Sequence, residues 1–129
     1  MEIDRPGVLA AVRAAFDAYE DALLRNDVDA LDAWFWDDER VVRFGIGELQ
    51  YGATAIAAWR RTSGGVSPDR RHRRVVVTTF GDDLGYVSLE FVDGDAPHVG
   101  RQTQVWARVG DSWRIVGAHV SVIGRAQSD

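Results

Sequence analysis

The residue with the clearest chemical potential in this sequence is Arg43, which lies inside the apolar run from Val41 to Phe44. A buried guanidinium needs an anionic partner, because leaving it unpaired costs on the order of several kcal/mol. Arg43 could have a purely structural role. It would then form an internal salt bridge to Glu48 or Glu90, or lie on the surface of an edge strand. We predict instead that Arg43 faces a pocket, where its paired N–H groups bind an anion.

Tyr19 is the second candidate, because it lies on the inner stripe of an amphipathic helix between Phe16 and Leu23. A tyrosine in such a position either packs in the core with its hydroxyl bonded to the backbone or presents that hydroxyl to a pocket. Beside Arg43, the phenol would have a lowered pKa and could act as a general acid or base. Tyr19 and Arg43 are therefore the predicted catalytic pair.

Other polar residues are candidates for substrate binding. The segment from Gly100 to Gln104 has polar residues on both strand faces, so one of these faces is not simply solvent-exposed. Arg101, Gln104 and His119 are predicted to orient the substrate, although the alternation leaves open which face of strand 100–109 lines the cavity. A lone strand histidine is also typical of a structural group. In the last strand, one face is predicted to carry Trp113, Ile115, Gly117, His119 and Ser121.

Bulky aromatic residues and one carboxylate complete the predicted site. Trp34, Trp36 and Tyr51, with Phe35, would exclude water and so strengthen the electrostatic interactions inside. Glu48 follows a Gly-x-Gly turn close to Arg43 and is placed with the substrate-binding residues.

Several classes of function are disfavoured by composition. The chain has no cysteine and no lysine, which removes disulfides, thiolate metal sites and Schiff-base chemistry. Its three histidines lack metal-ligand spacing, and no phosphate-binding loop or dinucleotide motif is present. We predict no metal and no cofactor. A net charge of −5 argues against nucleic-acid binding, and the basic cluster from Arg70 to Arg74 is predicted to be a solvated loop.

The sequence favours one soluble domain in the cytoplasm. Its 129 residues suit a single core, and no apolar run approaches the roughly 18 residues of a membrane span. The N-terminal residues lack the pattern of a signal peptide. The absence of cysteine is compatible with a reducing compartment.

Periodicity and turn residues predict three helices and six strands. Asp4 and Asp27 are predicted to cap the first two helices, with Pro6 in the first turn of the first. The helices are expected at Pro6–Asn26, Val28–Phe35 and Gly52–Arg61, and the strands at Arg40–Phe44, Glu48–Tyr51, His72–Phe80, Gly85–Val92, Gly100–Val109 and Ser112–Ile123. This order predicts an α+β fold with helices on one face of a curved, mainly antiparallel sheet. A long first helix across the concave face would leave a conical cavity.

Motifs along the chain resemble those of a known family. They are Y-E-x-A-L-x-x-N-D at Tyr19–Asp27, F-W-D-D at Phe35–Asp38, V-R-F-G-x-G-E at Val42–Glu48, Y-G at Tyr51–Gly52, G-R-Q-x-Q at Gly100–Gln104 and W-R-I-V-x-A-H-V-S at Trp113–Ser121. Together they resemble the AtzH-like and oxalurate-catabolism (HpxZ-like) group, in the SnoaL-like branch of the nuclear transport factor 2-like, cystatin-like superfamily.

The resemblance implies a single cone-shaped SnoaL-like domain over residues 1–129, with its core at about 8–123, and a homodimer formed through the open sheet face. It further implies a small anionic ligand of the carbamoyl or urea type. AtzH-like members resemble decarboxylating amidohydrolases, and the tyrosine and arginine proposed for them fall on Tyr19 and Arg43. The HpxZ-like members belong with oxalurate and urate-ring degradation.

Three functional hypotheses follow. The first is a metal-free, cofactor-free amidohydrolase acting on a carboxylated urea. The second is a non-catalytic binding or accessory subunit for an amidase in the same pathway. The third is an isomerase or hydratase that would use Glu48 or Glu90 as its base.

Overall fold

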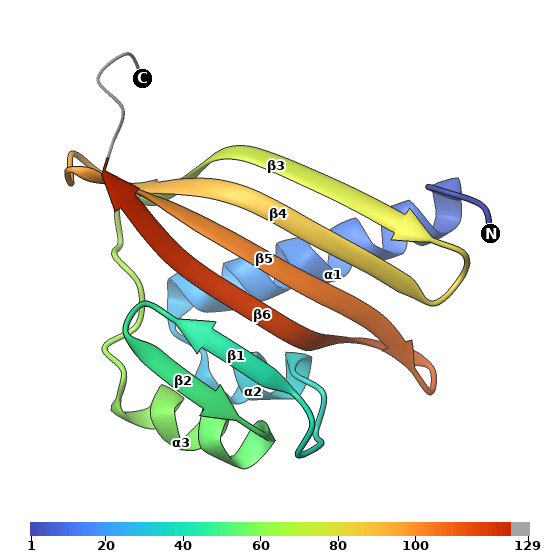
Figure 1. Cartoon of the computed structure of the whole chain (residues 1–129), viewed down its shortest axis with the longest axis horizontal. Coiled ribbons are helices and arrows are strands. Elements are labelled where there is room, and N and C mark those ends of the chain that lie inside the picture. The colour runs from blue at the N-terminus through green and yellow to red at the C-terminus, as the bar shows by residue number, and fades with distance from the viewer. Residues whose placement is uncertain (125–129) are drawn as a thin grey trace.

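The computed structural model describes residues 1–124 and confirms the α+β class (Figure 1). Its elements are α1 (Pro6–Arg25), α2 (Val28–Trp34), β1 (Val42–Gly45), β2 (Glu48–Tyr51), α3 (Ala53–Thr62), β3 (Arg70–Phe80), β4 (Leu84–Asp93), β5 (His98–Val109) and β6 (Ser112–Gly124). The three helices and six strands occur in the predicted order, and their ends differ from the predicted ones by about two residues or fewer.

The six strands form one sheet in the order β2-β1-β6-β5-β4-β3. Strands β3 to β6 form an antiparallel meander, as predicted. The hairpin of β1 and β2 joins this meander through a parallel pairing of β1 with β6, from Val42–Gly117 to Phe44–His119. This pairing places Arg43 beside Ala118 and puts the hairpin of β1 and β2 at one edge of the sheet.

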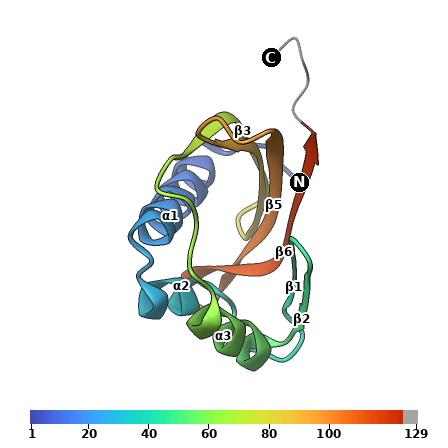
Figure 2. The same ribbon diagram turned by 90° about the vertical axis from the view of Figure 1, so that its left-hand side faces the viewer.

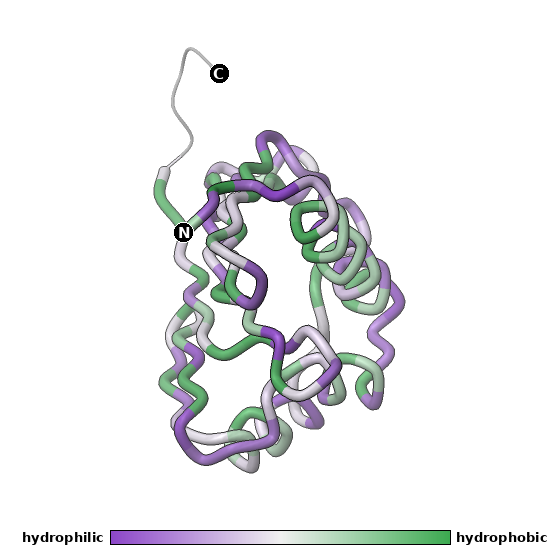
Figure 3. Tube along the Cα trace, turned by 90° about the vertical axis from the view of Figure 1, so that its right-hand side faces the viewer, coloured by the Kyte–Doolittle hydropathy of each residue, from purple (hydrophilic) through white to green (hydrophobic). Residues whose placement is uncertain are grey.

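The helices lie on one side of the sheet, and α1 runs along the longest strands (Figures 1 and 2). The inner stripe of α1 is buried, including Val12, Phe16 and Tyr19, and packs against a core that contains Trp106 and Ile115. Hydrophilic and hydrophobic residues alternate along the strands (Figure 3), as expected for a sheet with one covered face.

The predicted cap of the first helix is wrong, whereas that of the second is confirmed. Asp27 accepts a hydrogen bond from the Ala30 backbone amide at 3.2 Å. Asp4 instead accepts a hydrogen bond from the Thr79 amide at 2.8 Å, so it ties the N-terminus to β3. Residue Arg5 occupies the N-cap of α1 but its side chain does not cap the helix, and Pro6 begins the helix.

A β-bulge in β6 changes which side chains face the core. Val105 pairs with Gly117, and the next residue, Trp106, pairs with Ile115, so Val116 has no partner of its own. The extra residue reverses the alternation along β6. Ile115 is therefore buried while His119 is exposed, and the prediction that both share one face is wrong.

Candidate functional site

A cavity of about 530 Å³ lies between the helices and the inner face of the sheet. Apolar and aromatic side chains form much of its wall, and polar groups from both layers reach into it. Such a combination is typical of a small-molecule site. Seven of the polar residues that line the cavity matter for its chemistry. They are Tyr19, Arg43, Glu48, Arg60, Arg70, Gln102 and Gln104.

Arg43 enters the cavity from β1, with one edge of its guanidinium engaged. Its Nη1 atom donates to Gln50 Oε1 at 3.0 Å and lies 3.5 Å from Glu48 Oε1. The guanidinium carbon lies 3.9 Å from the centre of the Trp59 ring, which supports it by a cation–π contact. Nε and Nη2 form no hydrogen bond with residues 1–124. The internal pairing with Glu48 is thus present but long, and it leaves part of the donor fork for a ligand.

Burial lowers the pKa of Arg43 below its ordinary value, since removal from water disfavours the cation. The phenolate of Tyr19, where it is ionised, and the Glu48 carboxylate oppose this change, and the like charge of Arg60 adds to it. An anionic ligand would offset the loss of solvation, so the electrostatics of the site favour an anion.

Tyr19 reaches the same cavity from α1, and its ring contacts Phe35 and Trp106. Its hydroxyl forms no hydrogen bond with the described residues. Burial raises the pKa of Tyr19, and although Arg60, Arg43 and Arg70 act to lower it, the net change is upward. The expectation that Arg43 would lower this pKa overall is wrong, because desolvation outweighs the arginine charges. The phenol is therefore neutral at neutral pH and suited to donate a proton.

Arg60 adds a second guanidinium to the wall near Tyr19. Its Nε donates to Asp32 at 3.0 Å, and the group lies 5.2 Å from the Phe35 ring centre. Its Nη2 is enclosed and has no hydrogen-bond partner in the described part of the chain. Arg60 contributes positive potential to the cavity, while its own tip is covered by aromatic rings.

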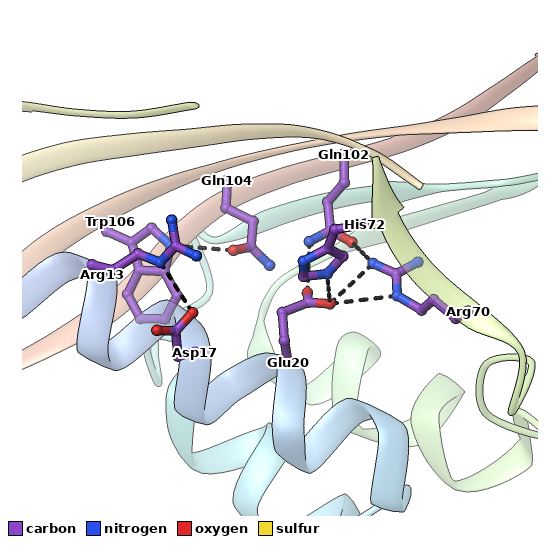
Figure 4. A network of polar contacts seen from close by, with 8 residues as sticks. All are labelled: Arg13, Asp17, Glu20, Arg70, His72, Gln102, Gln104 and Trp106. Atoms are coloured by element: carbon purple, nitrogen blue, oxygen red, sulfur yellow. Dashed lines mark hydrogen bonds and ion pairs between the residues drawn. The ribbon is translucent and has the colours of Figure 1, made fainter. Parts of the chain in front are cut away.

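A buried polar cluster, the Glu20 cluster, lies at another part of the wall (Figure 4). Glu20 Oε1 accepts from His72 Nε2 at 2.7 Å and from Arg70 Nη2 at 3.2 Å, and Glu20 Oε2 accepts from Gln102 Nε2 at 3.0 Å. Burial acts to raise the pKa of Glu20, but the His72 hydrogen bond, the Arg70 charge and the Gln102 hydrogen bond together hold it below its usual value.

The lowered pKa of Glu20 makes stability depend on pH. The unfolded chain binds a proton at Glu20 more readily than the folded chain, so this contribution to the free energy of unfolding is complete above about pH 4.5 and disappears as pH falls through the folded-state pKa. Urea unfolding from pH 6 to pH 3 should show a steeper loss of stability in wild type than in Glu20→Gln. Equal slopes for the two proteins would contradict this assignment.

The structure places the predicted site residues in two groups. Tyr19, Arg43, Glu48 and Gln104 line the cavity, and Gln104 accepts a hydrogen bond from Trp106 Nε1 at 3.1 Å. Arg101 and His119 lie on the outer face of the sheet, so their predicted place in the cavity is wrong. Arg101 donates to Ser121 there.

The predicted aromatic wall is also corrected. Trp34 and Trp36 border separate surface hollows, and Tyr51 is 63% exposed on the outer face, because successive residues of a strand or helix point in different directions. Phe35, the fourth residue of the predicted wall, does line the cavity, and Trp59 joins it there.

Sequence reasoning missed the Glu20 cluster. The segment from Arg70 to Arg74 is part of β3 and not a loop, and the Arg70 side chain is 3% exposed. The one available signal was Glu20, a carboxylate on the buried stripe of α1 next to Tyr19.

Two observations concern metals and membranes. Among residues 1–124, no group of three or more histidine, aspartate or glutamate side chains could hold a metal ion. None of the helices in this part of the chain combines the length and apolarity needed to span a membrane.

Comparison with known proteins identifies the family. The AtzH-like family pattern matches residues 1–126. The chain belongs to the AtzH-like family. A search of curated proteins gave no match for this AtzH-like chain.

Solved structures with the same fold include two that are also similar in sequence to this AtzH-like protein. A cystatin-like fold protein from Burkholderia xenovorans is 48% identical, with 98% of this chain and 99% of that chain covered and a TM-score of 0.95. A protein of unknown function from Pectobacterium atrosepticum is 44% identical, with 95% of each chain covered and a TM-score of 0.91. A ketosteroid isomerase-like protein from Erwinia carotovora atroseptica is 21% identical, with 94% of this chain and 100% of that chain covered and a TM-score of 0.74. This similarity shows the fold alone.

Proposed function

We propose that this AtzH-like protein is a decarboxylating amidohydrolase that acts on a carboxylated urea or a related carbamoyl anion in nitrogen-compound catabolism in the cytoplasm, without a metal or cofactor. The observation that carries the proposal is that the Tyr19 hydroxyl and the unengaged edge of Arg43 share one largely apolar cavity. A proton donor beside a cationic fork suits an anion whose breaking bond must receive a proton.

In the proposed reaction, the carbon–nitrogen bond of an N-carboxylate breaks and its electron pair stays on the nitrogen. The carboxylate leaves as carbon dioxide, and the Tyr19 hydroxyl gives its proton to the nitrogen. Water then returns a proton to the phenolate, so the sum is one proton consumed and one carbon dioxide released. The raised pKa of Tyr19 keeps the phenol protonated, so its proton is present for transfer to the nitrogen.

Arg43 orients the substrate in this scheme. Its free N–H groups bind carboxylate oxygens and set the breaking bond next to Tyr19. Glu48, at 3.5 Å from Nη1, offsets part of the guanidinium charge. Arg43 therefore aligns the substrate carboxylate but does not bind it so strongly that conversion to neutral carbon dioxide becomes unfavourable.

Replacing Tyr19 with phenylalanine should lower kcat by about 100-fold and leave KM nearly unchanged, because the proton donor is lost while Arg43 still binds the substrate. Carbon dioxide release from carboxylated ureas would be measured. Tyr51→Phe, at an exposed position outside the cavity, is the matched control and should behave as wild type. Undiminished turnover by Tyr19→Phe would rule out this role.

A second candidate function is a binding or accessory subunit of an amidase. The outer face of the sheet supports it, because no helix of residues 1–124 covers this face (Figure 2) and exposed apolar side chains are found there, including Leu49, Tyr51, Val105 and Ile123. We propose that a second copy of the chain covers this face as a homodimer, and the accessory role then requires apolar area beyond what that homodimer buries. Co-purification with an amidase, with no turnover by the chain alone, would decide for the accessory role.

An isomerase or hydratase receives less support from the carboxylates. Glu90 pairs with Arg73 at 2.6 Å and does not line the cavity, so it is unsuited to act as the base. Glu48 lines the cavity but already interacts with Arg43.

A further inference from the structure

Arg70 is held rigidly in the cavity wall. Its Nη2 donates to Glu20 Oε1 at 3.2 Å and to Gln102 Oε1 at 3.1 Å, and its guanidinium carbon lies 4.0 Å from the centre of the Phe91 ring. With the side chain 3% exposed, these contacts fix both the position and the plane of the guanidinium.

One edge of this guanidinium is not used by the protein. Nη1 of Arg70 donates no hydrogen bond to residues 1–124. It is also not among the enclosed side-chain atoms that lack a partner in that range, which are Arg60 Nη2 and Asp93 Oδ1. Nη1 therefore borders open space, and the open space beside this buried side chain is the cavity.

Arg70 and Arg43 enter the cavity on the same face of the sheet, from strands near its two opposite edges. Arg70 begins β3 at one edge, Arg43 lies on β1, and strands β6, β5 and β4 lie between them. A ligand that contacts both arginines must therefore have an oxygen acceptor at each end.

The two arginines differ in how closely a carboxylate of the protein balances their charge. Arg70 is paired with Glu20 at hydrogen-bond distance inside the protein, so the pair is close to neutral. Arg43 has only the longer contact with Glu48. A near-neutral but directional donor suits an uncharged carbonyl oxygen better than a second carboxylate.

We propose that Arg70, held by Glu20 and Gln102, is a second ligand-binding residue that donates from Nη1 to the uncharged carbonyl oxygen of a ureido or carbamoyl group, while Arg43 binds the carboxylate of the same ligand. This inference rests on the proposed function and specifies its ligand as a carbamoyl-bearing acid. It also assigns a binding role to a residue that the sequence placed in a solvated loop.

Two ligands of equal size test the assignment. N-carbamoylglycine has a carboxylate and a terminal carbamoyl group, and 4-methylpentanoate has the same carboxylate, with an isopropyl group in place of the carbamoyl group and a methylene in place of the N–H. Calorimetry gives the ratio of their affinities for each variant of the full chain. Relative to wild type, Arg70→Gln should lower the preference for N-carbamoylglycine by about 10-fold or more, as expected for loss of a hydrogen bond from a charged donor.

Controls separate binding from folding. Arg70→Lys keeps a cation for Glu20 but lacks the planar fork, so it should also lose the preference while the affinity for 4-methylpentanoate stays near that of wild type. Arg71→Gln removes the same charge from the exposed neighbouring position and should keep the preference. Binding of 4-methylpentanoate shows that each variant is folded.

The outcomes distinguish the two proposals. An unchanged ratio in both Arg70 variants, or an equal loss in Arg71→Gln, overturns the inference and leaves the proposed function standing. Failure of the wild type to bind either ligand overturns the carboxylated-urea assignment and the inference together.

Discussion

Replacing Arg43 with glutamine should reduce kcat/KM for a carboxylated urea by about 1,000-fold. The change removes the cation that binds the carboxylate and aligns the breaking bond, and interactions of this kind contribute strongly in a site that excludes water. Arg43→Lys should recover only part of this loss, because an ammonium cannot both keep the contact with Gln50 and present a second edge to the ligand. Initial rates over a range of substrate concentrations give both values.

The control for Arg43 is Arg40→Gln in the segment just before β1. Arg40 pairs with Asp38 at 2.9 Å and is largely exposed, so its loss changes the net charge equally without altering the cavity. Wild-type kinetics are expected. The assignment of Arg43 fails if the two variants have the same kcat/KM.

Replacing Glu20 with alanine should lower the free energy of unfolding by about 3–5 kcal/mol at pH 7. The substitution leaves the buried Arg70 cation without its carboxylate and deprives His72 and Gln102 of an acceptor. Urea unfolding followed by circular dichroism measures the change.

Asp17→Ala provides the comparison for Glu20. Asp17 lies one turn earlier on α1 and pairs with Arg13 in an exposed i,i+4 contact at 3.1 Å. Such a pair contributes about 0.5 kcal/mol. Equal unfolding midpoints for the two alanine variants would show that the Glu20 cluster does not stabilise the fold.

The order of the helices and strands could be predicted because each element has its own local signal. Helical spacing from Val12 to Tyr19 and the Gly110-Asp111 turn identify their elements without reference to the rest of the chain. The parallel pairing of β1 with β6 has no such signal, since it joins residues more than 70 positions apart. It depends on which surfaces remain free after the meander and helices have packed.

The site was predictable only where a single residue conflicted with its neighbours. Arg43 in an apolar strand and Tyr19 on a buried helical stripe are both conflicts of this kind, and both residues line the cavity. His119 was misplaced because one unpaired residue, Val116, reverses the alternation in β6. Arg70 was misplaced because its charged neighbours suggest exposure, while the carboxylate that allows its burial lies 50 residues away.

Gly100 connects the backbone of the sheet to the ligand site although it has no side chain. A Cβ atom at this position would lie 2.0 Å from the Phe91 ring, and that ring supports the Arg70 guanidinium. The Gly100 backbone, the Phe91 ring and the Arg70 guanidinium thus lie against one another in that order. A methyl group at position 100 would displace the ring and, with it, the guanidinium. Variation at position 100 among relatives should therefore be coupled to variation at position 70, and ligand preference can change through a residue that no ligand touches.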